Sequence, residues 1–145
     1  MVITRRPALI SDIEFARGAH HAAYRDVVER QFKIWDEAAQ DQFFANDWAS
    51  GEFEIVLWDG AECGYLSIAE YESHIHVREL VIAPEYQGRG IGSSLLRTTI
   101  EEARAKGIPV KLGALHENRA LVLYRRLGFR ETGRTETHTI MEWNA

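Results

Sequence analysis

The sequence predicts an α/β fold in which one sheet of mixed direction is flanked by four helices. Short runs that alternate polar and apolar residues take turns with longer runs of helical period, as is typical of α/β chains. Asp59-Gly60 separates two of the alternating runs and is a strong signal for a hairpin of antiparallel strands. Residues 75–115 read as strand, turn, helix and strand, which indicates a helical crossover between parallel strands. A hairpin and a crossover together require strands of both directions.

The first part of the chain supplies four strands and two helices. The first helix follows Ser11-Asp12, whose residue types cap helices, and the second starts near Asp36. Their apolar sides run to Val27 and Trp48. The strands are expected at Val2–Arg6, Glu52–Trp58, Gly64–Tyr71 and Ile75–Ala83.

The second part of the chain supplies two helices and three strands. One helix carries a buried stripe of apolar spacing and ends at Lys106-Gly107, with glycine in the usual C-terminal position. The stripe consists of Ile91, Leu95, Leu96, Thr99, Ile100 and Ala103. The remaining elements are a strand at Val110–Leu115, a helix at Asn118–Leu127 closed by Gly128, and a hairpin of Phe129–Gly133 and Thr137–Trp143.

Length and composition predict a single domain, 1–145, with no broad nucleic-acid-binding face. The chain has 145 residues, near the commonest domain size, and its formal net charge of -5 argues against a basic surface. Its one cysteine, Cys63, excludes an intrachain disulfide and is expected to fill space in a strand. No signal-like or membrane-spanning apolar run is visible. We therefore expect a cytoplasmic protein without a membrane partner.

A glycine-rich turn, Gln87–Gly92, predicts an anion site. Its glycines reach positive φ and let the backbone approach a ligand, while the next helix adds free N–H groups and its positive dipole end. The spacing G-x-G-x-G differs from the dinucleotide-binding pattern, and no lysine followed by serine or threonine closes a nucleotide-triphosphate loop. Glycine content alone leaves a purely structural turn open.

Two segments in the same order resemble motifs of the GNAT N-acetyltransferase family. Residues 80–92 resemble its acetyl-CoA signature, a strand that often ends in proline followed by Gln/Arg-x-x-Gly-x-Gly/Ala, in which Gln87, Gly90 and Gly92 fill the defining places. Residues 118–129 resemble its N-x-x-A-x-x-L-Y-x-x-x-G-F helix. The resemblance implies a GNAT-like splayed sheet of six to seven strands, with acetyl-CoA as cosubstrate.

The resemblance also implies where acetyl-CoA binds. The pantetheine arm would use backbone groups of Val81 and Ile82, and the pyrophosphate would lie on the amides of the turn. The implied cofactor-binding set is Val81, Ile82, Gln87, Gly88, Arg89, Gly90, Ile91, Gly92, Ser93, Asn118 and Tyr124. For Arg89, as for Arg125 and Arg126, a solvated surface charge is the alternative to a phosphate contact.

Direct acetyl transfer needs an acid for the departing thiolate and a neutral amine. The resemblance makes Tyr124 the acid and leaves Cys63 without a role. Glu79 and His76, on the strand before the turn, are the candidate bases, with Glu79 ranked first. Some family members need no dedicated base.

The acceptor is expected to be a small-molecule amine or a peptide amine, beside the first two helices and the closing hairpin. Tyr24, Arg25 and Arg78 are the predicted substrate residues, whereas Trp35 is expected to pack between helices. His20-His21 and His74-x-His76 lack a supporting ligand cluster in sequence, so no metal is predicted. A CoA-binding regulatory module without turnover is the alternative function. Dimers are frequent in the family, which leaves a homodimer open.

Overall fold

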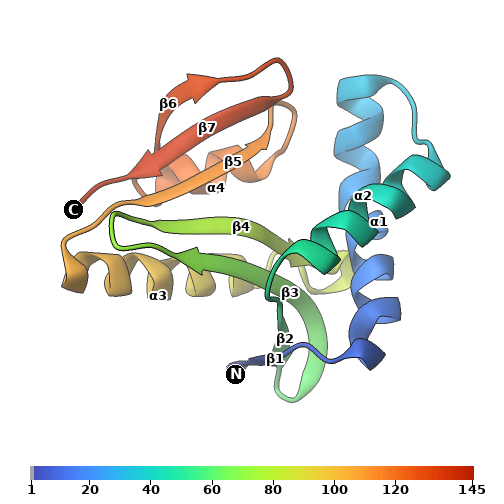
Figure 1. Ribbon diagram of the computed structural model, residues 1–145, viewed down its shortest axis with the longest axis horizontal. Helices are drawn as coiled ribbons and strands as arrows, with labels where there is room; N and C mark the ends of the chain where they lie inside the picture. The colour runs from blue at the N-terminus through green and yellow to red at the C-terminus, as the bar shows by residue number, and fades with distance from the viewer. Residues whose placement is uncertain (1) are drawn as a thin grey trace. The chain divides into compact units, whose positions relative to one another are not determined.

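The computed structural model describes residues 2–145, which form four α-helices and one seven-stranded sheet (Figure 1). The strand order in the sheet is β1-β2-β3-β4-β5-β7-β6. The helices are α1 (Ile13–Phe32), α2 (Glu37–Ser50), α3 (Ile91–Lys106) and α4 (Ala120–Arg126). The strands are β1 (Ile3–Pro7), β2 (Glu54–Trp58), β3 (Ala61–Glu70), β4 (Ile75–Ile82), β5 (Val110–Leu115), β6 (Arg130–Arg134) and β7 (His138–Trp143). The α/β fold with a mixed, open sheet is thus confirmed.

The chain divides into two compact units. Unit 1 contains the residues up to Ser67 together with Glu79–Ile91, and unit 2 contains Ile68–Arg78 together with Gly92–Ala145. The boundary passes through β3 and β4, so each of these strands gives residues to both units.

Unit 1 is built on a meander of antiparallel strands. β1 pairs with β2 from Ile3↔Trp58 to Pro7↔Glu54, and β2 pairs with β3. The hairpin between β2 and β3 turns at Asp59 and Gly60, whose φ angles of 48° and 86° fit the type I′ turn that this dipeptide predicts. The meander and the first two helices contribute side chains to one core cluster, which consists of Ala16, Ala19, Phe44, Phe53, Ile55, Tyr65, Val81 and Ala83.

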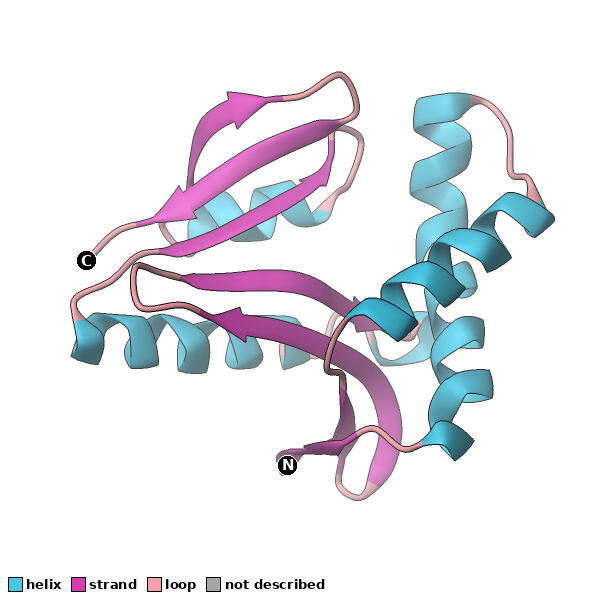
Figure 2. Ribbon diagram, in the orientation of Figure 1, coloured by secondary structure: helices cyan, strands magenta, loops and turns pink. Residues whose placement is uncertain are grey.

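Unit 2 contains the parallel pair and the closing hairpin. β4 runs parallel to β5 over Ile75↔Val110 to Val77↔Leu112. β5 pairs antiparallel with β7, which pairs with β6, so these three strands lie side by side (Figure 2). Every residue of the predicted α3 stripe from Leu95 to Ala103 is buried, as is Ile91 at the end of unit 1. α3 therefore buries the face that its apolar spacing predicted.

The start of α1 differs from the expected cap. Ile10–Asp12 forms a 3₁₀ turn before the helix, and the Asp12 carboxylate turns back to accept from Leu9 N–H at 2.7 Å and from Arg6 at 2.8 and 2.9 Å. The Arg6 guanidinium holds the pKa of Asp12 below its usual value. The Asp12 carboxylate, which the sequence predicts as a cap for the start of α1, therefore forms an ion pair with Arg6 of β1 instead.

No helix among residues 2–145 combines the length and the apolar character that a bilayer crossing requires.

Candidate active site

The predicted anion site is a turn that follows β4. A short 3₁₀ turn, Pro84–Tyr86, leads into it, and Gly88 and Gly90 have φ angles of 77° and 82°. A Cβ built on either glycine would meet nothing within 4 Å, so glycine is required there by backbone conformation and not by crowding. Gly92 lies inside the first turn of α3 without a positive φ. The turn and the helix start therefore present backbone N–H groups, as an anion site requires.

Two side chains of the predicted cofactor set brace this turn. Gln87 Nε2 donates to the Ile82 carbonyl at 2.9 Å, which ties the turn to the end of β4. Arg89 donates to the Glu85 carbonyl at 3.2 Å, and its guanidinium lies over the rings of Tyr86 and Trp58, at 5.4 and 5.9 Å from their centroids. Both side chains are exposed, and each contacts other protein groups of this region.

A helix-capping motif explains the second family-like segment. Asn118 Oδ1 accepts from Ala120 N–H at 2.8 Å and so begins α4. At the other end, Phe129 N–H donates to the Tyr124 carbonyl at 3.0 Å and Gly128 N–H donates to the Arg125 carbonyl at 3.1 Å. Gly128 has a φ of 101°, which completes a Schellman motif. The spacing Y-x-x-x-G-F is thus the signature of a helix end that fixes the tyrosine.

Tyr124 is held by this motif in an apolar setting. Its ring centroid lies 6.0 Å from that of Phe129, the contact that commonly accompanies such a cap. Burial raises the pKa of Tyr124 to about 12. The phenol is therefore protonated throughout the neutral pH range and can serve as a proton donor.

The C-terminal part of β4 lies very close to β3. A Cβ on Gly64 of β3 would overlap the carbonyl oxygen of Val81 and lie 3.1 Å from Ile82 Cα. Ala83 N–H donates to the Cys63 carbonyl at 2.8 Å in the same region. Glycine at position 64 thus allows the close approach of β3 that fixes the backbone of Val81 and Ile82, both of which are predicted to contact pantetheine.

The two candidate bases have different surroundings. Glu79, in unit 1, accepts a 2.8 Å hydrogen bond from the hydroxyl of Tyr65. His76, in unit 2, is half-buried, and burial followed by the charges of His74, Arg78 and Lys111 lowers its pKa. His76 is therefore largely neutral at pH 7 and retains the lone pair that a base needs. Tyr65 was missed in the sequence, because nothing local marks a strand tyrosine as the partner of a carboxylate 14 residues away.

The three predicted substrate residues differ in their surroundings. Arg25 Nε donates to Glu29 at 2.6 Å, and its guanidinium lies 5.7 Å from the Trp35 ring centroid. Tyr24 is half-buried against the core cluster of unit 1, whereas Arg78 is exposed on β4.

Cys63 is fully buried, and burial raises the pKa of its thiol. Both observations agree with the expectation that this cysteine fills space in a strand.

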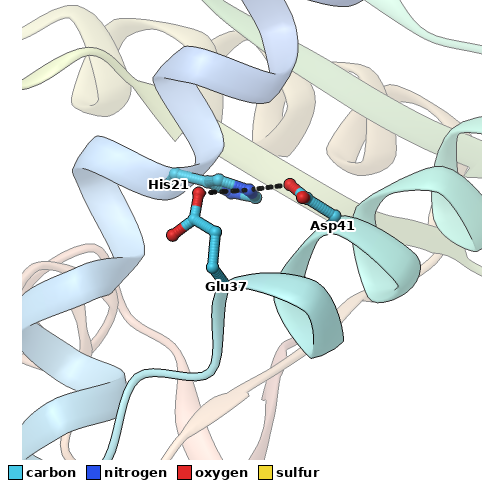
Figure 3. A group of neighbouring side chains, drawn as sticks. All are labelled: His21, Glu37 and Asp41. Atoms are coloured by element: carbon cyan, nitrogen blue, oxygen red, sulfur yellow. Dashed lines mark hydrogen bonds and ion pairs between the residues drawn. The ribbon is translucent and has the colours of Figure 1, made fainter.

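A histidine and two carboxylates meet between α1 and α2 (Figure 3). His21 Nε2 lies 2.6 Å from Asp41 Oδ1 and 3.8 Å from Glu37 Oε1, and one ligand atom from each residue falls within 4.8 Å of the others. No sequence spacing marks this group, because the two carboxylates come from one helix and the imidazole from another. The direct bond from His21 to Asp41 accounts for the arrangement as a helix–helix contact.

His20 is buried beneath this group and provides a test by acid. Its Nδ1 lies 2.9 Å from His21 Nδ1, and its ring packs against Tyr24 and Phe44. Burial, helped by His21, lowers the pKa of His20 from 6.5 to about 4. Because the unfolded chain binds this proton at higher pH than the folded chain, stability should fall as the pH drops from 6.5 towards 4.

We expect His20 to account for a loss of at most about 3 kcal/mol in the free energy of unfolding across this window. Urea unfolding at a series of pH values measures it, with His20→Gln as the comparison. The variant should show a flatter pH dependence between 6.5 and 4 than the wild type. If stability fell with pH equally in the two proteins, burial of a neutral His20 ring would not be the cause of the acid destabilisation.

Known proteins resemble the chain in sequence and in fold. The sequence model of a protein family, the acetyltransferase (GNAT) domain, matches residues 49–131 of this chain. The L-methionine sulfoximine/L-methionine sulfone acetyltransferase of Pseudomonas aeruginosa is 31% identical over 126 residues, covering 77% of this chain and 73% of that protein. The N-alpha-acetyltransferase RimI of Mycobacterium tuberculosis is 39% identical over 116 residues, covering 73% and 70%.

A solved structure shares the whole fold. The PaiA N-acetyltransferase of Thermoplasma acidophilum, crystallised in complex with coenzyme A, aligns over 100% of both chains with a TM-score of 0.80 and 18% identity. The matched domain spans the glycine-rich turn and the capped tyrosine helix. This chain therefore belongs to the GNAT acetyltransferase family and is an acetyl-CoA-dependent N-acetyltransferase.

Proposed function

We propose that the chain acts as one catalytic domain that acetylates an amino-acid α-amine, with Tyr124 as the acid. The observation that carries the assignment of Tyr124 as the acid is the Schellman motif, which fixes this buried tyrosine at the end of α4. The single domain is supported by β3 and β4, each of which gives residues to both compact units. The α-amine is supported by relatives whose names specify an amino-acid derivative and an N-alpha position.

We propose that acetyl-CoA is held mainly by backbone groups. The residues from Gly88 to Ser93 offer amides to the pyrophosphate, and the open space at Gly88 and Gly90 fits an approaching anion. Val81 and Ile82 offer backbone groups to pantetheine. Gln87 and Arg89 act by holding the turn in shape, since both bind protein groups.

In the proposed reaction the amine attacks the thioester carbonyl, and the C–S bond breaks with its electron pair on sulfur. Tyr124 gives its phenolic proton to that sulfur and regains one from solvent. The proton lost by the amine passes to Glu79 and then to solvent. His76 is the alternative base, supported by its lowered pKa. Glu79 is favoured because a buried hydroxyl holds its carboxylate.

A free-thiol assay with acetyl-CoA across free amino acids, their derivatives and short peptides tests the acceptor. We expect thiol release with α-amines and none with their N-methylated or N-acetylated forms. Release only with lysine side chains or polyamines would overturn the α-amine. Binding of acetyl-CoA by calorimetry without thiol release for any amine would instead favour a regulatory CoA-binding module.

Adding one methyl group to each of two glycines separates the structural and binding demands of the turn. Gly90→Ala must hold a positive φ and should weaken acetyl-CoA binding about 10-fold, because the left-handed conformation costs roughly 1–2 kcal/mol. Gly92 lies in a helix, and the Cβ added by Gly92→Ala would be 3.9 Å from its nearest neighbour, Leu123 Cδ2. It should leave binding nearly unchanged and stabilise the fold by up to about 1 kcal/mol.

Calorimetry with acetyl-CoA and thermal melts measure the two effects. Equal affinity in wild type and Gly90→Ala would show that this backbone conformation does not form the pyrophosphate site.

A further inference from the structure

Tyr65 of β3 is a fully buried side chain with one polar atom. Its ring lies in an aromatic cluster, edge-on to Phe44, Trp48 and Phe53, at centroid distances of 6.3, 6.1 and 5.6 Å. Edge-to-face contacts of this kind fix the orientation of a ring as well as its depth. The hydroxyl is therefore aimed by packing from α2 and from the segment before β2.

The Tyr65 hydroxyl uses its hydrogen on the carboxylate of Glu79. The Oη to Oε1 distance is 2.8 Å, and both residues belong to unit 1. Burial and the charge of Glu79 raise the pKa of Tyr65, with smaller effects from Tyr24 of α1 and Asp47 of α2. These are the ionisable groups that act on the hydroxyl from β4, α1 and α2. The phenol therefore stays protonated and remains a donor to the carboxylate at every working pH.

We propose that Tyr65 is a positioning residue for catalysis, which holds Glu79 Oε1 so that the second carboxylate oxygen faces the acceptor amine. The proposal rests on Glu79 being the base. A glutamate has three rotatable side-chain bonds, and one fixed oxygen removes most of the freedom of the other. Tyr65 itself exchanges no proton with the substrate. Its hydrogen bond also favours the ionised carboxylate, the form that can accept a proton.

Tyr65→Phe tests this proposal because the ring and its aromatic contacts are retained. We expect kcat/KM for the acceptor amine to fall about 10-fold while the KM for acetyl-CoA stays unchanged. The midpoint of the acid limb of the kcat/KM profile should move upward by about half a pH unit or more, since loss of a donor favours the protonated carboxyl. Because stability also falls in acid, circular dichroism of Tyr65→Phe over the same pH range establishes that the variant stays folded, so that partial unfolding does not imitate the shift.

Tyr71→Phe is the matched control, since it removes a hydroxyl from a tyrosine that is 54% exposed. Its rates and pH profile should equal those of the wild type. Glu79→Gln and the double variant Tyr65→Phe/Glu79→Gln complete the experiment. If Tyr65 acts through Glu79, removing its hydroxyl should cost nothing further once the carboxylate is gone.

The outcomes distinguish two failures. Wild-type activity in Glu79→Gln would remove Glu79 as the base and the proposal with it. Loss of activity in Glu79→Gln, with an unshifted profile and normal rate in Tyr65→Phe, would keep the base and overturn the positioning. Additive losses in the double variant would also overturn it, because they require Tyr65 to act independently.

Discussion

Replacing Tyr124 with phenylalanine is expected to lower kcat at least about 100-fold, with the KM for acetyl-CoA within a few-fold of the wild-type value. General acids typically contribute this much or more when they protonate a leaving group. The ring remains, so the contact with Phe129 and the Schellman motif at the end of α4 are preserved. What is lost is only the proton for the departing thiolate.

The pKa of about 12 makes Tyr124 a weak acid for this task. Protonating a thiolate of pKa about 8.5 is uphill by roughly 5 kcal/mol in reference terms. The buried surroundings that raise the tyrosine pKa should raise the thiol pKa as well, which narrows this gap. A consequence is that Tyr124 should cause no alkaline loss of activity below about pH 11.

Free-thiol release under saturating acetyl-CoA measures this effect, with circular dichroism to establish folding. Tyr71→Phe again serves as the control for removal of a hydroxyl. If Tyr124→Phe turned over at the wild-type rate, the thiolate would have to obtain its proton from water, and Tyr124 would be a packing residue.

Replacing Gly64 with alanine is expected to lower the free energy of unfolding by about 3 kcal/mol or more. The added Cβ would overlap the carbonyl oxygen of Val81, and a backbone atom has no rotamer through which to escape. Relief requires β3 and β4 to separate where Ala83 N–H bonds the Cys63 carbonyl. Acetyl-CoA binding should weaken too, because Val81 and Ile82 would move.

Urea unfolding followed by circular dichroism measures the loss. Gly18→Ala provides the matched control, because Gly18 is a helical glycine with nothing within 4 Å of its added Cβ. That variant should gain up to about 1 kcal/mol from better helix propensity. Equal stability of Gly64→Ala and wild type would mean that the two strands can part at little cost.

Local chemistry made much of the fold readable from the sequence. The stripe of α3 and the glycine after it predict a helix whose buried face and end both match the structure. The Asp59-Gly60 turn and the strand-turn-helix order predict a mixed sheet for the same reason, since each signal acts within a few residues. Family membership likewise followed from two contiguous segments.

Tertiary contacts decided what local patterns could not. Asp12 precedes α1, but its carboxylate pairs with Arg6 of β1 and caps no N–H of the helix, because folding brings that guanidinium within hydrogen-bonding distance. The pairing of His21 with Glu37 and Asp41 depends on how two helices lie together.

The family motifs, the glycine-rich turn and the tyrosine helix are each encoded by neighbours along the chain, so they can be identified without a structure. The hydrogen bond from Tyr65 to Glu79 and the close approach of the Val81 carbonyl to Gly64 arise only when the chain folds. Those contacts join residues 14 or more positions apart. Their geometry is set by the twist and spacing of β3 and β4, which no short segment specifies.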